Sequence, residues 1–414
     1  MPVIKSFKAF RPQPELVTKV ASPPYDVINS GEARQLVKDN PYSFLHVNKA
    51  EIDLDSSVDH YNQKVYEKAS ENLNKLINER VYLQDEEEKI YIYRQMMKER
   101  AQTGLVACVS IDDYFKGKIK KHENTREDKE KDRINHIDFT NANTGPVFLT
   151  YKAKDEIKQI VNRWTKEEKP VYDFTSEDGI THTCWVIDDK STIQQLIESF
   201  AEIDYLYIAD GHHRAAAATK VGLKRRKEFK DYTGKEEFNY SLSVLFPHDE
   251  LYIMDYNRVV ADLAGNSEKE FIQKISEKFK VEKYDDKGSY RPNARHTFGM
   301  YLDNCWYKLT AKPGTFDEDD AVDSLDVSIL QNNLLTPILE IKDPRTDQRI
   351  EFVGGIRGLE ELEKRVKAGM KVAFSLYFTS IEELMKVADE ERLMPPKSTW
   401  FEPKLRSGIF IHKL

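Results

Sequence analysis

The sequence predicts a mixed α+β protein, that is, an irregular α/β protein, with more than one domain. Helical and strand patterns alternate along the chain without the regular order of a doubly wound sheet. The chain has 414 residues, which is enough for two or three domains that each bury a core. Hydrophobic residues make up 40% of it, with only 17 Gly and 16 Pro, which excludes disordered and collagen-like chains.

Residues 1–200 are expected to form an N-terminal α+β region. Its start should be extended, because Pro23 and Pro24 fix their own φ angles and disfavour helix before them. Apolar residues spaced three or four apart predict a long helix over 57–80. The other helices predicted here are 31–38, 120–136 and 156–166, and the predicted strands are 90–94, 104–111 and 147–151.

Two further regions follow. Residues 201–262 are predicted to form a phosphate-binding core, which opens with an apolar strand over 203–209 and a helix over 214–226. Residues 263–414 are predicted to form a C-terminal α+β region. Its tail, 394–414, is expected to pack back on the core as a strap.

Composition excludes several classes of protein. No apolar run approaches the 18 residues of a membrane span, and the first residues lack a hydrophobic signal core, so we expect a cytoplasmic protein with no membrane partner. The net charge of −8 argues against nucleic acid as the main partner. The scattered Cys108, Cys184 and Cys305 are expected to be buried free thiols.

The most specific motif joins a predicted strand to an alanine-rich helix. It reads Asp210, Gly211, His212, His213, Arg214, followed by four alanines. Gly211 permits a tight turn, and the start of a helix offers unpaired amides and a positive dipole end to an anion. The two His and the Arg add donors and charge, so all five residues are predicted to bind phosphate. The alternative is that Asp210 merely caps the helix and that the histidines lie on the surface.

The charged segment 120–136 is the second candidate. If it is helical, five basic residues share one face beside a stripe of three glutamates. Such a pair of stripes suits a phosphate site with a carboxylate base, for which Glu123 is preferred, or else a salt-bridged surface helix. The basic residues are His122, Arg126, Lys129, Arg133 and His136, and the acidic ones are Glu123, Glu127 and Glu130.

The tail and the other histidines carry weaker evidence. Lys397 is a donor in a proline-stiffened loop, although Trp400 and Phe401 would equally anchor a packed strap there. Asp26, after two prolines, is a minor candidate. The remaining histidines stand alone and are predicted to be non-catalytic: His46, His60, His182, His248, His296 and His412.

These residues carry a resemblance to a known family. Over essentially its whole length the chain resembles the bacterial and archaeal domain-of-unknown-function family 1015. The sequence contains none of the common Walker A, G-x-G-x-x-G, H-E-x-x-H or G-x-S-x-G motifs. The family name implies no reaction. The matching runs are 21–28, 121–133, 143–151, 209–218, 343–358 and 394–408.

A second, local resemblance covers about 203–260. The box from Asp210 to Ala216 is similar to the phosphate-binding box of the ParB and sulfiredoxin superfamily, which also includes free-serine kinases. The resemblance implies a ParB/sulfiredoxin-like core. Sulfiredoxins need a Cys where this chain has His212, and ParB proteins add a DNA-binding helix-turn-helix that we do not find here. The free-serine kinases have the most similar box.

Together the motif and the resemblances predict a phosphoryl-transfer enzyme that acts on a small phosphorylated metabolite. Genes of family 1015 often lie beside serine-biosynthesis genes, which implies phosphoserine and serine as substrates. Glu123 would orient the attacking group, or His212 would transfer the proton, and His122, Arg126 and Lys397 would bind the rest of the substrate. Mg²⁺ on Asp210 or Glu123 is expected, with ATP or ADP as a possible nucleotide.

Two other functions stay open. One is a nucleotide-binding regulatory module without catalysis, and the other is a nucleic-acid enzyme that uses the 120–136 stripe. The direction of the reaction, kinase or phosphatase, and the oligomeric state also stay open.

Overall fold

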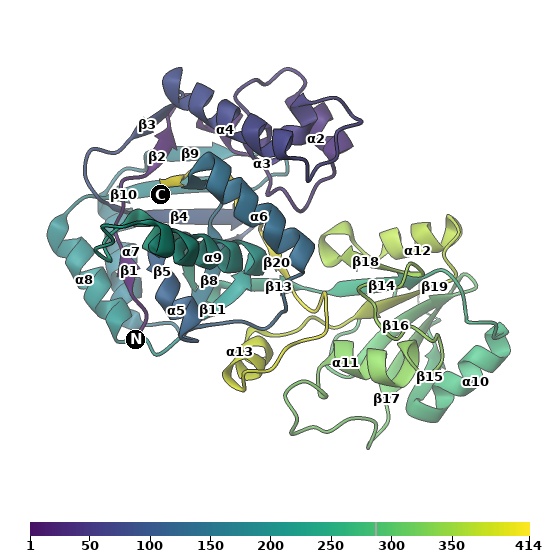
Figure 1. Cartoon of the computed structure of the whole chain (residues 1–414). Helices are drawn as coiled ribbons and strands as arrows, with labels where there is room; N and C mark the ends of the chain where they lie inside the picture. The colour runs from purple at the N-terminus through teal and green to yellow at the C-terminus, as the bar shows by residue number, and fades with distance from the viewer. Residues whose placement is uncertain (286–287) are drawn as a thin grey trace. The chain divides into compact units, whose positions relative to one another are not determined.

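The computed structural model describes residues 1–285 and 288–414, which form two compact units (Figure 1). Unit 1 comprises Met1–Leu251 and Pro403–Leu414, and unit 2 comprises Tyr252–Glu402. Both units combine helices with sheets, which confirms the prediction of a mixed α+β protein with more than one domain.

Unit 1 is built on a mixed sheet with the strand order β6-β11-β8-β12-β5-β4-β10-β9, and β1 also pairs with β5. β11 runs parallel to β6, and β12 runs parallel to β8, while the other neighbours are antiparallel. The strands are β1 Ile4–Lys5, β4 Ile90–Met97, β5 Arg100–Ser110, β6 Ile119–Lys120, β8 Val147–Tyr151, β9 Tyr172–Thr175, β10 Thr181–Ile187, β11 Leu206–Asp210 and β12 Tyr240–Pro247.

Helices flank this sheet. The α-helices are α1 Val17–Val20, α2 Ser30–Val37, α3 Leu45–Asn48, α4 Gln63–Asn78, α5 Ile111–Phe115, α6 Glu127–Thr140, α7 Asp155–Glu167, α8 Lys190–Ala201 and α9 His212–Glu228. Short 3-10 turns occur at Ala50–Asp53, Glu237–Asn239 and His248–Glu250. Two small ribbons pair β2 Phe10–Pro12 with β3 Tyr82–Gln84, and β7 Ala142–Asn143 with β21 His412–Lys413.

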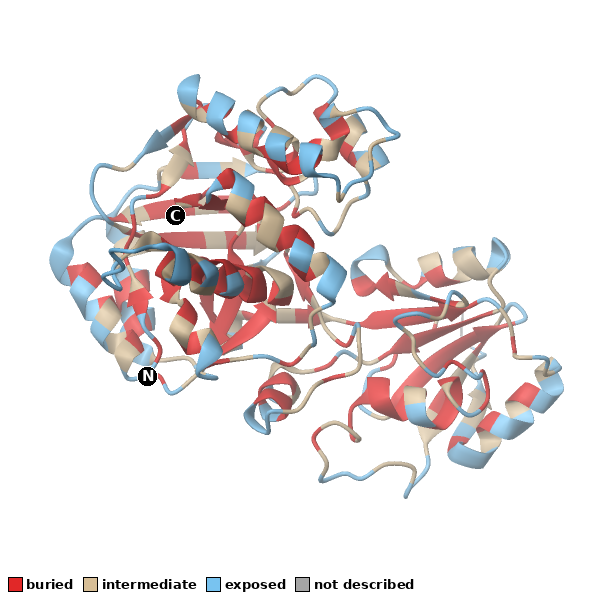
Figure 2. Cartoon of the chain, viewed as in Figure 1, coloured by how far each residue is buried: buried red, intermediate tan, exposed pale blue. Residues whose placement is uncertain are grey.

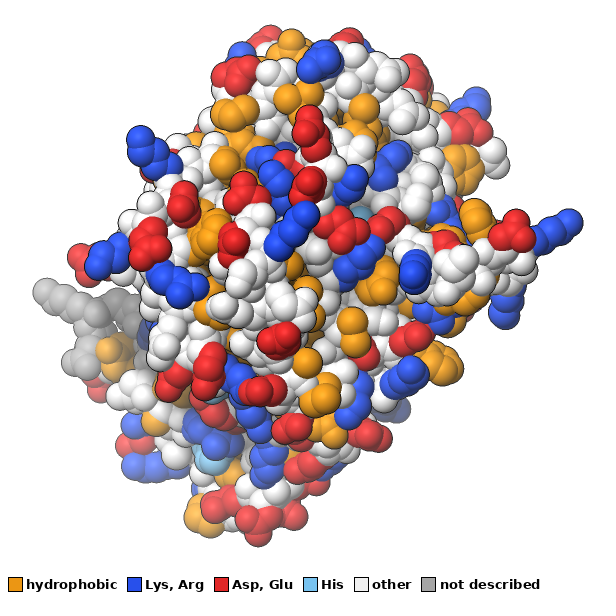
Figure 3. Space-filling view, turned by 90° about the vertical axis from the view of Figure 1, so that its left-hand side faces the viewer, with side chains coloured by type: hydrophobic (Ala, Val, Ile, Leu, Met, Phe, Trp, Pro, Cys, Tyr) orange, Lys and Arg blue, Asp and Glu red, His pale blue; other side chains and the backbone are white. Residues whose placement is uncertain are grey.

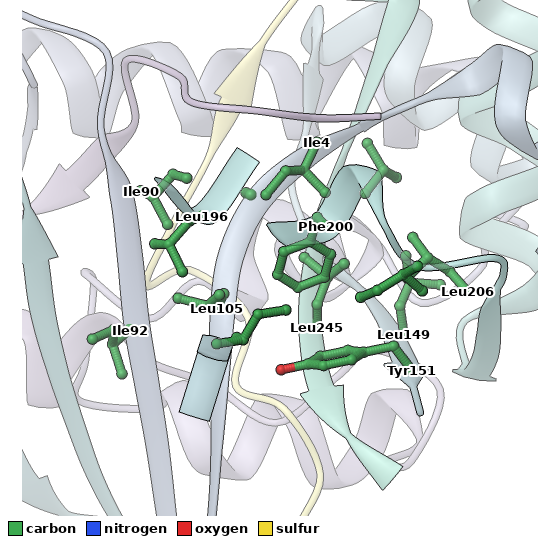
Figure 4. Close-up of a cluster of buried hydrophobic side chains, with 14 of the residues drawn as sticks. Ile4, Ile90, Ile92, Leu105, Leu149, Tyr151, Leu196, Phe200, Leu206 and Leu245 are labelled. Carbon is green, nitrogen blue, oxygen red and sulfur yellow. The ribbon is translucent and has the colours of Figure 1, made fainter. Parts of the chain in front are cut away.

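The main core of unit 1 lies between one face of the sheet and helices α7 and α8. Phe200 and Leu196 of α8 pack there against Leu149 and Leu245 of the strands (Figure 4). Burying a side chain of this kind contributes roughly 1.5–3 kcal/mol. Figure 2 shows the pattern in the whole unit, with buried residues along the strands and exposed residues on the outer faces of the helices.

Unit 2 contains an antiparallel sheet with the order β15-β17-β16-β19-β14-β18. A separate ribbon pairs β13 Tyr252–Met254 with β20 Trp400–Glu402. The sheet strands are β14 Tyr256–Val260, β15 Phe279–Lys283, β16 Thr297–Leu302, β17 Cys305–Ala311, β18 Ile350–Gly354 and β19 Val372–Leu376. The helices are α10 Glu268–Lys278, α11 Asp326–Leu330, a π-helical turn Gln331–Leu335, a 3-10 turn Gly355–Arg357, α12 Glu360–Lys367 and α13 Ile381–Asp389.

The two units do not coincide with the three predicted ranges. Residues 1–200 and 201–251 share one sheet, because β12 pairs with β5 and β8. β14 belongs to the sheet of unit 2, so the division falls at Leu251 rather than near 262. The tail is also divided, since β20 belongs to unit 2 and Pro403–Leu414 to unit 1.

One predicted helix is wrong over its first seven residues. Ile119 and Lys120 form β6, which pairs in parallel with Leu206 and Tyr207 of β11. The chain then runs as a loop to Arg126, and α6 begins at Glu127. The first turn of α6 is rich in acidic residues, which stabilise the helix there because they lie at the positive end of its dipole. His122 and Arg126 therefore do not share a helical face with Lys129, Arg133 and His136.

The cysteines match the expectation of buried free thiols only in part. All three cysteines are free; Cys108 and Cys184 are buried, whereas Cys305 is only partly so. Among the described residues, no helix has both the length and the apolar character that crossing a membrane requires.

Unit 2 holds a buried carboxyl group whose titration should be visible in stability. Asp326 is 8% exposed; burial raises its pKa to about 7, although the His296 backbone N–H donates to Oδ1. The folded chain then binds a proton that the unfolded chain, with a pKa near 3.8, releases. The free energy of unfolding of unit 2 should therefore fall as pH rises from about 4 to about 7, by at most about 4 kcal/mol from this group.

Asp326→Asn should remove that slope, because the amide keeps the acceptor and carries no charge. We expect the variant to be more stable than the wild type at pH 8 and similar to it below pH 4, as measured by hydrogen exchange of the α11 and β16 amides. Asp303→Asn, at an exposed position of the same unit, is the control. Equal pH dependence in wild type and Asp326→Asn would contradict the prediction.

Candidate functional site

The site is built on the strand–turn–helix predicted from the sequence. β11 ends at Asp210, Gly211 has a left-handed φ of +95°, and α9 begins at His212. A Cβ on Gly211 would lie 2.9 Å from Nε of Arg214, so glycine is required both by the backbone and by the side chain beside it. The alanines 215–218 are buried, which lets α9 pack closely.

Asp210 does not cap this helix. The N-cap residue of α9 is Gly211, which has no side chain that could accept a hydrogen bond from the first turn. The Asp210 carboxylate instead contacts Nζ of Lys404 at 3.2 Å and Nη2 of Arg214 at 3.8 Å. Burial raises the pKa of Asp210, but these two cations outweigh it and lower the pKa below its usual value. The interpretation of Asp210 as an ordinary cap is therefore wrong.

Next to the turn, the loop after β6 supplies His122 and Glu123. The parallel pairing of β6 with β11 brings this loop to the end of β11. The His122 and His212 rings are perpendicular, with centroids 4.5 Å apart. One potential ligand atom from each of His122, Glu123 and His212 lies within 4.8 Å of the other two, so these three residues could hold a metal ion.

Both histidines of this group are buried, with 2% exposure for His122 and 6% for His212. Burial lowers the pKa of His122 to about 4 and that of His212 well below 6.5, so both rings are neutral at pH 7. Nδ1 of His122 and Nε2 of His212 have no hydrogen-bond partner in the described part of the chain. A neutral imidazole can accept a proton or ligate a metal.

The charged segment lies beside the turn, as a loop followed by α6. The Arg126 backbone N–H donates to Nε2 of His213 at 3.0 Å. An ion pair joins Glu130 to Lys220, and α6 and α9 lie side by side (Figure 1). The Arg126 guanidinium pairs with Asp128 and its side chain is 60% exposed.

The predicted basic stripe is not an exposed surface. Arg133 and His136 are buried. Arg133 donates through Nε and Nη2 to Asp132, and its guanidinium lies 4.0 Å from the centre of the Tyr25 ring. Of the stripe, only Lys129 and Arg126 remain near solvent.

A cavity lies beside the turn and is lined by segments that are far apart in sequence. Arg214 belongs both to the turn and to the cavity. It contacts Asp210 at the end of β11, lines the cavity, and donates through Nη1 to the Pro146 carbonyl at 2.5 Å. Nε of Arg214 is buried without a partner in the described residues. The polar lining residues are Tyr25, Asn48, Arg133, His136, Asn143, Thr144, Arg214, Ser241 and Ser407.

Sequence reasoning misses several of these residues. Tyr25 falls in the start of the chain, which is expected to be extended, and Asn143 and Thr144 precede the predicted strand 147–151. Lys404 and Ser407 belong to the tail, from which the sequence favours Lys397 instead. Lys397 lies in unit 2, where its ammonium is 5.8 Å from the Tyr256 ring. The available clue is that each missed residue lies in or next to a run that resembles family 1015.

Gly211→Ala tests the geometry of the turn. The substitution places a Cβ against Arg214 and forces an L residue into the left-handed region, which costs about 1–2 kcal/mol. Gly117→Ala is a matched control, because Gly117 has φ +70° but a Cβ added there would meet nothing within 4 Å. We expect similar small losses of thermal stability in both variants and a loss of phosphate binding by calorimetry only in Gly211→Ala. Unchanged binding in Gly211→Ala would contradict this.

Comparison with known proteins gives distantly similar structures. Among solved structures, a variant of a free serine kinase in complex with AMP has 13% identity, covers 74% of this chain and 92% of its own, and has a TM-score of 0.37. A conserved hypothetical protein from Pyrococcus furiosus has 14% identity, coverages of 74% and 94%, and a TM-score of 0.36. SbnI with a C-terminal truncation, from Staphylococcus aureus, has 9% identity, coverages of 73% and 85%, and a TM-score of 0.36.

No curated protein matches the chain. A family model does match it, and the match runs over residues 4–328 and so includes the β11–α9 turn, the loop after β6 and most of the residues that line the cavity. Because this covers well over half of the sequence, the chain belongs to the family described as protein of unknown function, DUF1015.

Proposed function

We propose that this protein is a phosphoryl-transfer enzyme that acts on a small phosphorylated metabolite, with phosphoserine and serine as the substrate pair. The observation that carries the proposal is the position of Arg214 between the start of α9 and the polar cavity, with Nε buried and unpartnered among the described residues. A buried donor without a partner is costly, and an anion would satisfy it.

The phosphate would lie at the first turn of α9. The backbone amides of Gly211, His212 and His213 would donate to its oxygens, since the first amides of a helix have no partner within the helix. Arg214 would supply charge, and Lys404 beside Asp210 adds a second cation. Phosphoryl transfer depends mainly on positioning and charge neutralisation, which such a cradle provides.

Proton transfer would use the group beside the turn. Neutral His212 can take the proton of an attacking hydroxyl or water, or the Glu123 carboxylate can orient that group. His122 and Arg126 would contact the rest of the substrate. Among the predicted ligands for Mg²⁺, Glu123 is favoured over Asp210, because Asp210 already pairs with Lys404 and Arg214. ATP or ADP would be the phosphoryl donor in the kinase direction.

The nucleic-acid alternative loses its main support, because Arg133 and His136 are buried. Acidic and basic side chains are interspersed on the face drawn in Figure 3. The regulatory alternative shares the phosphate site and differs only in turnover.

The deciding experiment uses the full chain with Mg²⁺. Phosphate release from phosphoserine and phosphoserine formation from serine with ATP or ADP are measured in parallel. We expect turnover in one of these assays. If the protein binds nucleotide stoichiometrically by calorimetry but shows no turnover in any of these assays, the enzyme hypothesis is wrong and the regulatory module is favoured.

A further inference from the structure

We infer that His122, Glu123 and His212 form a binding site for a divalent transition metal such as Zn²⁺ or Mn²⁺, in preference to Mg²⁺. With this ion bound, Glu123 holds a transition metal in place of Mg²⁺, and His212 is a ligand and not the proton acceptor. The inference goes beyond the proposed reaction, because metal binding can be measured without any substrate. The three side chains each offer a ligand atom, and these atoms all lie within 4.8 Å of one another.

The strongest evidence is the tautomer of His122. Its ring hydrogen-bonds the backbone of Ile208, while Nδ1 has no partner among the described residues, so the bond to Ile208 uses Nε2. A ring that donates Nε2–H to a carbonyl leaves the lone pair of Nδ1 bare and buried. Histidines that bind metals are commonly oriented in this way, with the other ring nitrogen donating to a backbone carbonyl or carboxylate.

His212 supplies the second nitrogen. Its Nε2 is also buried without a partner in the described residues, and its ring stands perpendicular to that of His122 at 4.5 Å. Two neighbouring rings that each bury an unsatisfied nitrogen are unusual in a folded protein and call for an explanation. A cation between them, with Glu123 as the anionic ligand, would satisfy both.

The ligand types select the class of metal. Two imidazoles and one carboxylate suit Zn²⁺, Mn²⁺ or Fe²⁺, whereas Mg²⁺ prefers oxygen ligands in octahedral geometry. The nearby charges have opposite effects on a bound cation. The Asp210 carboxylate attracts it, whereas Lys121 on the same loop and the two cations beside Asp210, Arg214 and Lys404, repel it. Three protein ligands would leave positions for a phosphate oxygen or a water molecule.

The test measures metal content directly. The full-length protein is stripped with a chelator, incubated separately with Zn²⁺, Mn²⁺, Co²⁺ and Mg²⁺, desalted, and analysed by plasma mass spectrometry. We expect a single Zn²⁺, Mn²⁺ or Co²⁺ ion per chain, with Mg²⁺ neither retained nor competing. The visible d–d absorption bands of the Co²⁺ form should differ from those of aqueous Co²⁺, because imidazole nitrogens replace water as ligands.

The variants His122→Gln and His212→Gln should each abolish retention, and Glu123→Gln should weaken it at least about 10-fold. His60→Gln, at an exposed histidine, is the control and should behave as the wild type. Circular dichroism identifies any variant that fails to fold, and Glu123→Gln then carries the test because Glu123 is only partly buried.

Two results would overturn the inference: no retained metal in the wild-type protein, or equal retention in the wild type and in folded His122 and Glu123 variants. Metal retention without phosphoryl turnover would support this inference while contradicting the proposed function. The two can therefore fail separately.

Discussion

Arg214→Ala is expected to lower phosphoryl-transfer turnover by about 10²–10³-fold, the usual loss when one preorganised donor is removed from a site of developing charge. Arg214 presents a fork of donors at the start of α9, and only one of its contacts, Nη1 to the Pro146 carbonyl, is a hydrogen bond to the described residues. Arg214→Lys keeps the charge but loses the fork, so we expect an intermediate loss.

The measurements are turnover of phosphoserine and serine, together with thermal melting. Helix α9 should survive, because Ala is the best helix former. Arg225→Ala is the matched control, since Arg225 lies in the last turn of the same helix and pairs with Asp138. Near-wild-type turnover in Arg214→Ala would refute the site. A fall in Tm of more than about 10 °C would instead assign Arg214 a structural role, since such a shift means some 2 kcal/mol or more.

His212→Ala is expected to abolish turnover as well. It removes both a proton acceptor and one of the three potential metal ligands. Turnover that stays near the wild-type value would exclude His212 from the chemistry.

Asp132→Ala should destabilise unit 1 by about 3–5 kcal/mol, which is the largest effect expected on stability. Asp132 is buried, accepts two hydrogen bonds from Arg133 and one from the Tyr66 hydroxyl at 3.0 Å, and is the ion-pair partner of Arg133. Removing one member of a buried ion pair leaves the other charge uncompensated. The Tyr25 ring beside the guanidinium can offset only part of this, about 2 kcal/mol.

Because the chain has two units, the effect should be followed by hydrogen exchange of amides in α6 and β8, which report on unit 1. Tyr66→Phe is the control: it removes one hydrogen bond to the same carboxylate and should cost about 1 kcal/mol. If Asp132→Ala costs no more than Tyr66→Phe, the ion pair does not matter for stability. Ligand binding in the cavity should weaken with Asp132→Ala, because Arg133 lines it.

Local signals in the sequence are enough to predict the turn at 210–214. An apolar strand, a glycine and an alanine run each determine their own backbone conformation over a few residues, and the structure has β11, Gly211 and α9 in those places. The capped helices of the C-terminal region are predictable for the same reason, as the capping boxes at Ser267 and Ser380 show.

The charged segment shows where local patterns mislead. Basic residues at 122, 126, 129, 133 and 136 fit a helical face, but the pairing of Lys120 with Tyr207 of β11 keeps the start of the segment out of the helix. That pairing joins residues more than 80 positions apart and leaves no periodic trace in the sequence. The same loop then places His122 and Glu123 against His212, which no spacing within the segment could reveal.

The sequence by itself thus determined the mixed α+β class, the strand–turn–helix and the residue types available for an anion. Tertiary structure alone decided that β12 joins 1–200 and 201–251 in one sheet, that Lys404 from the tail pairs with the Asp210 carboxylate, and that Tyr25, Asn143 and Ser407 line one cavity. The physical reason is that short-range conformational preferences act over a few residues. Sheet pairing and buried ion pairs instead depend on which distant segments meet when the core is buried.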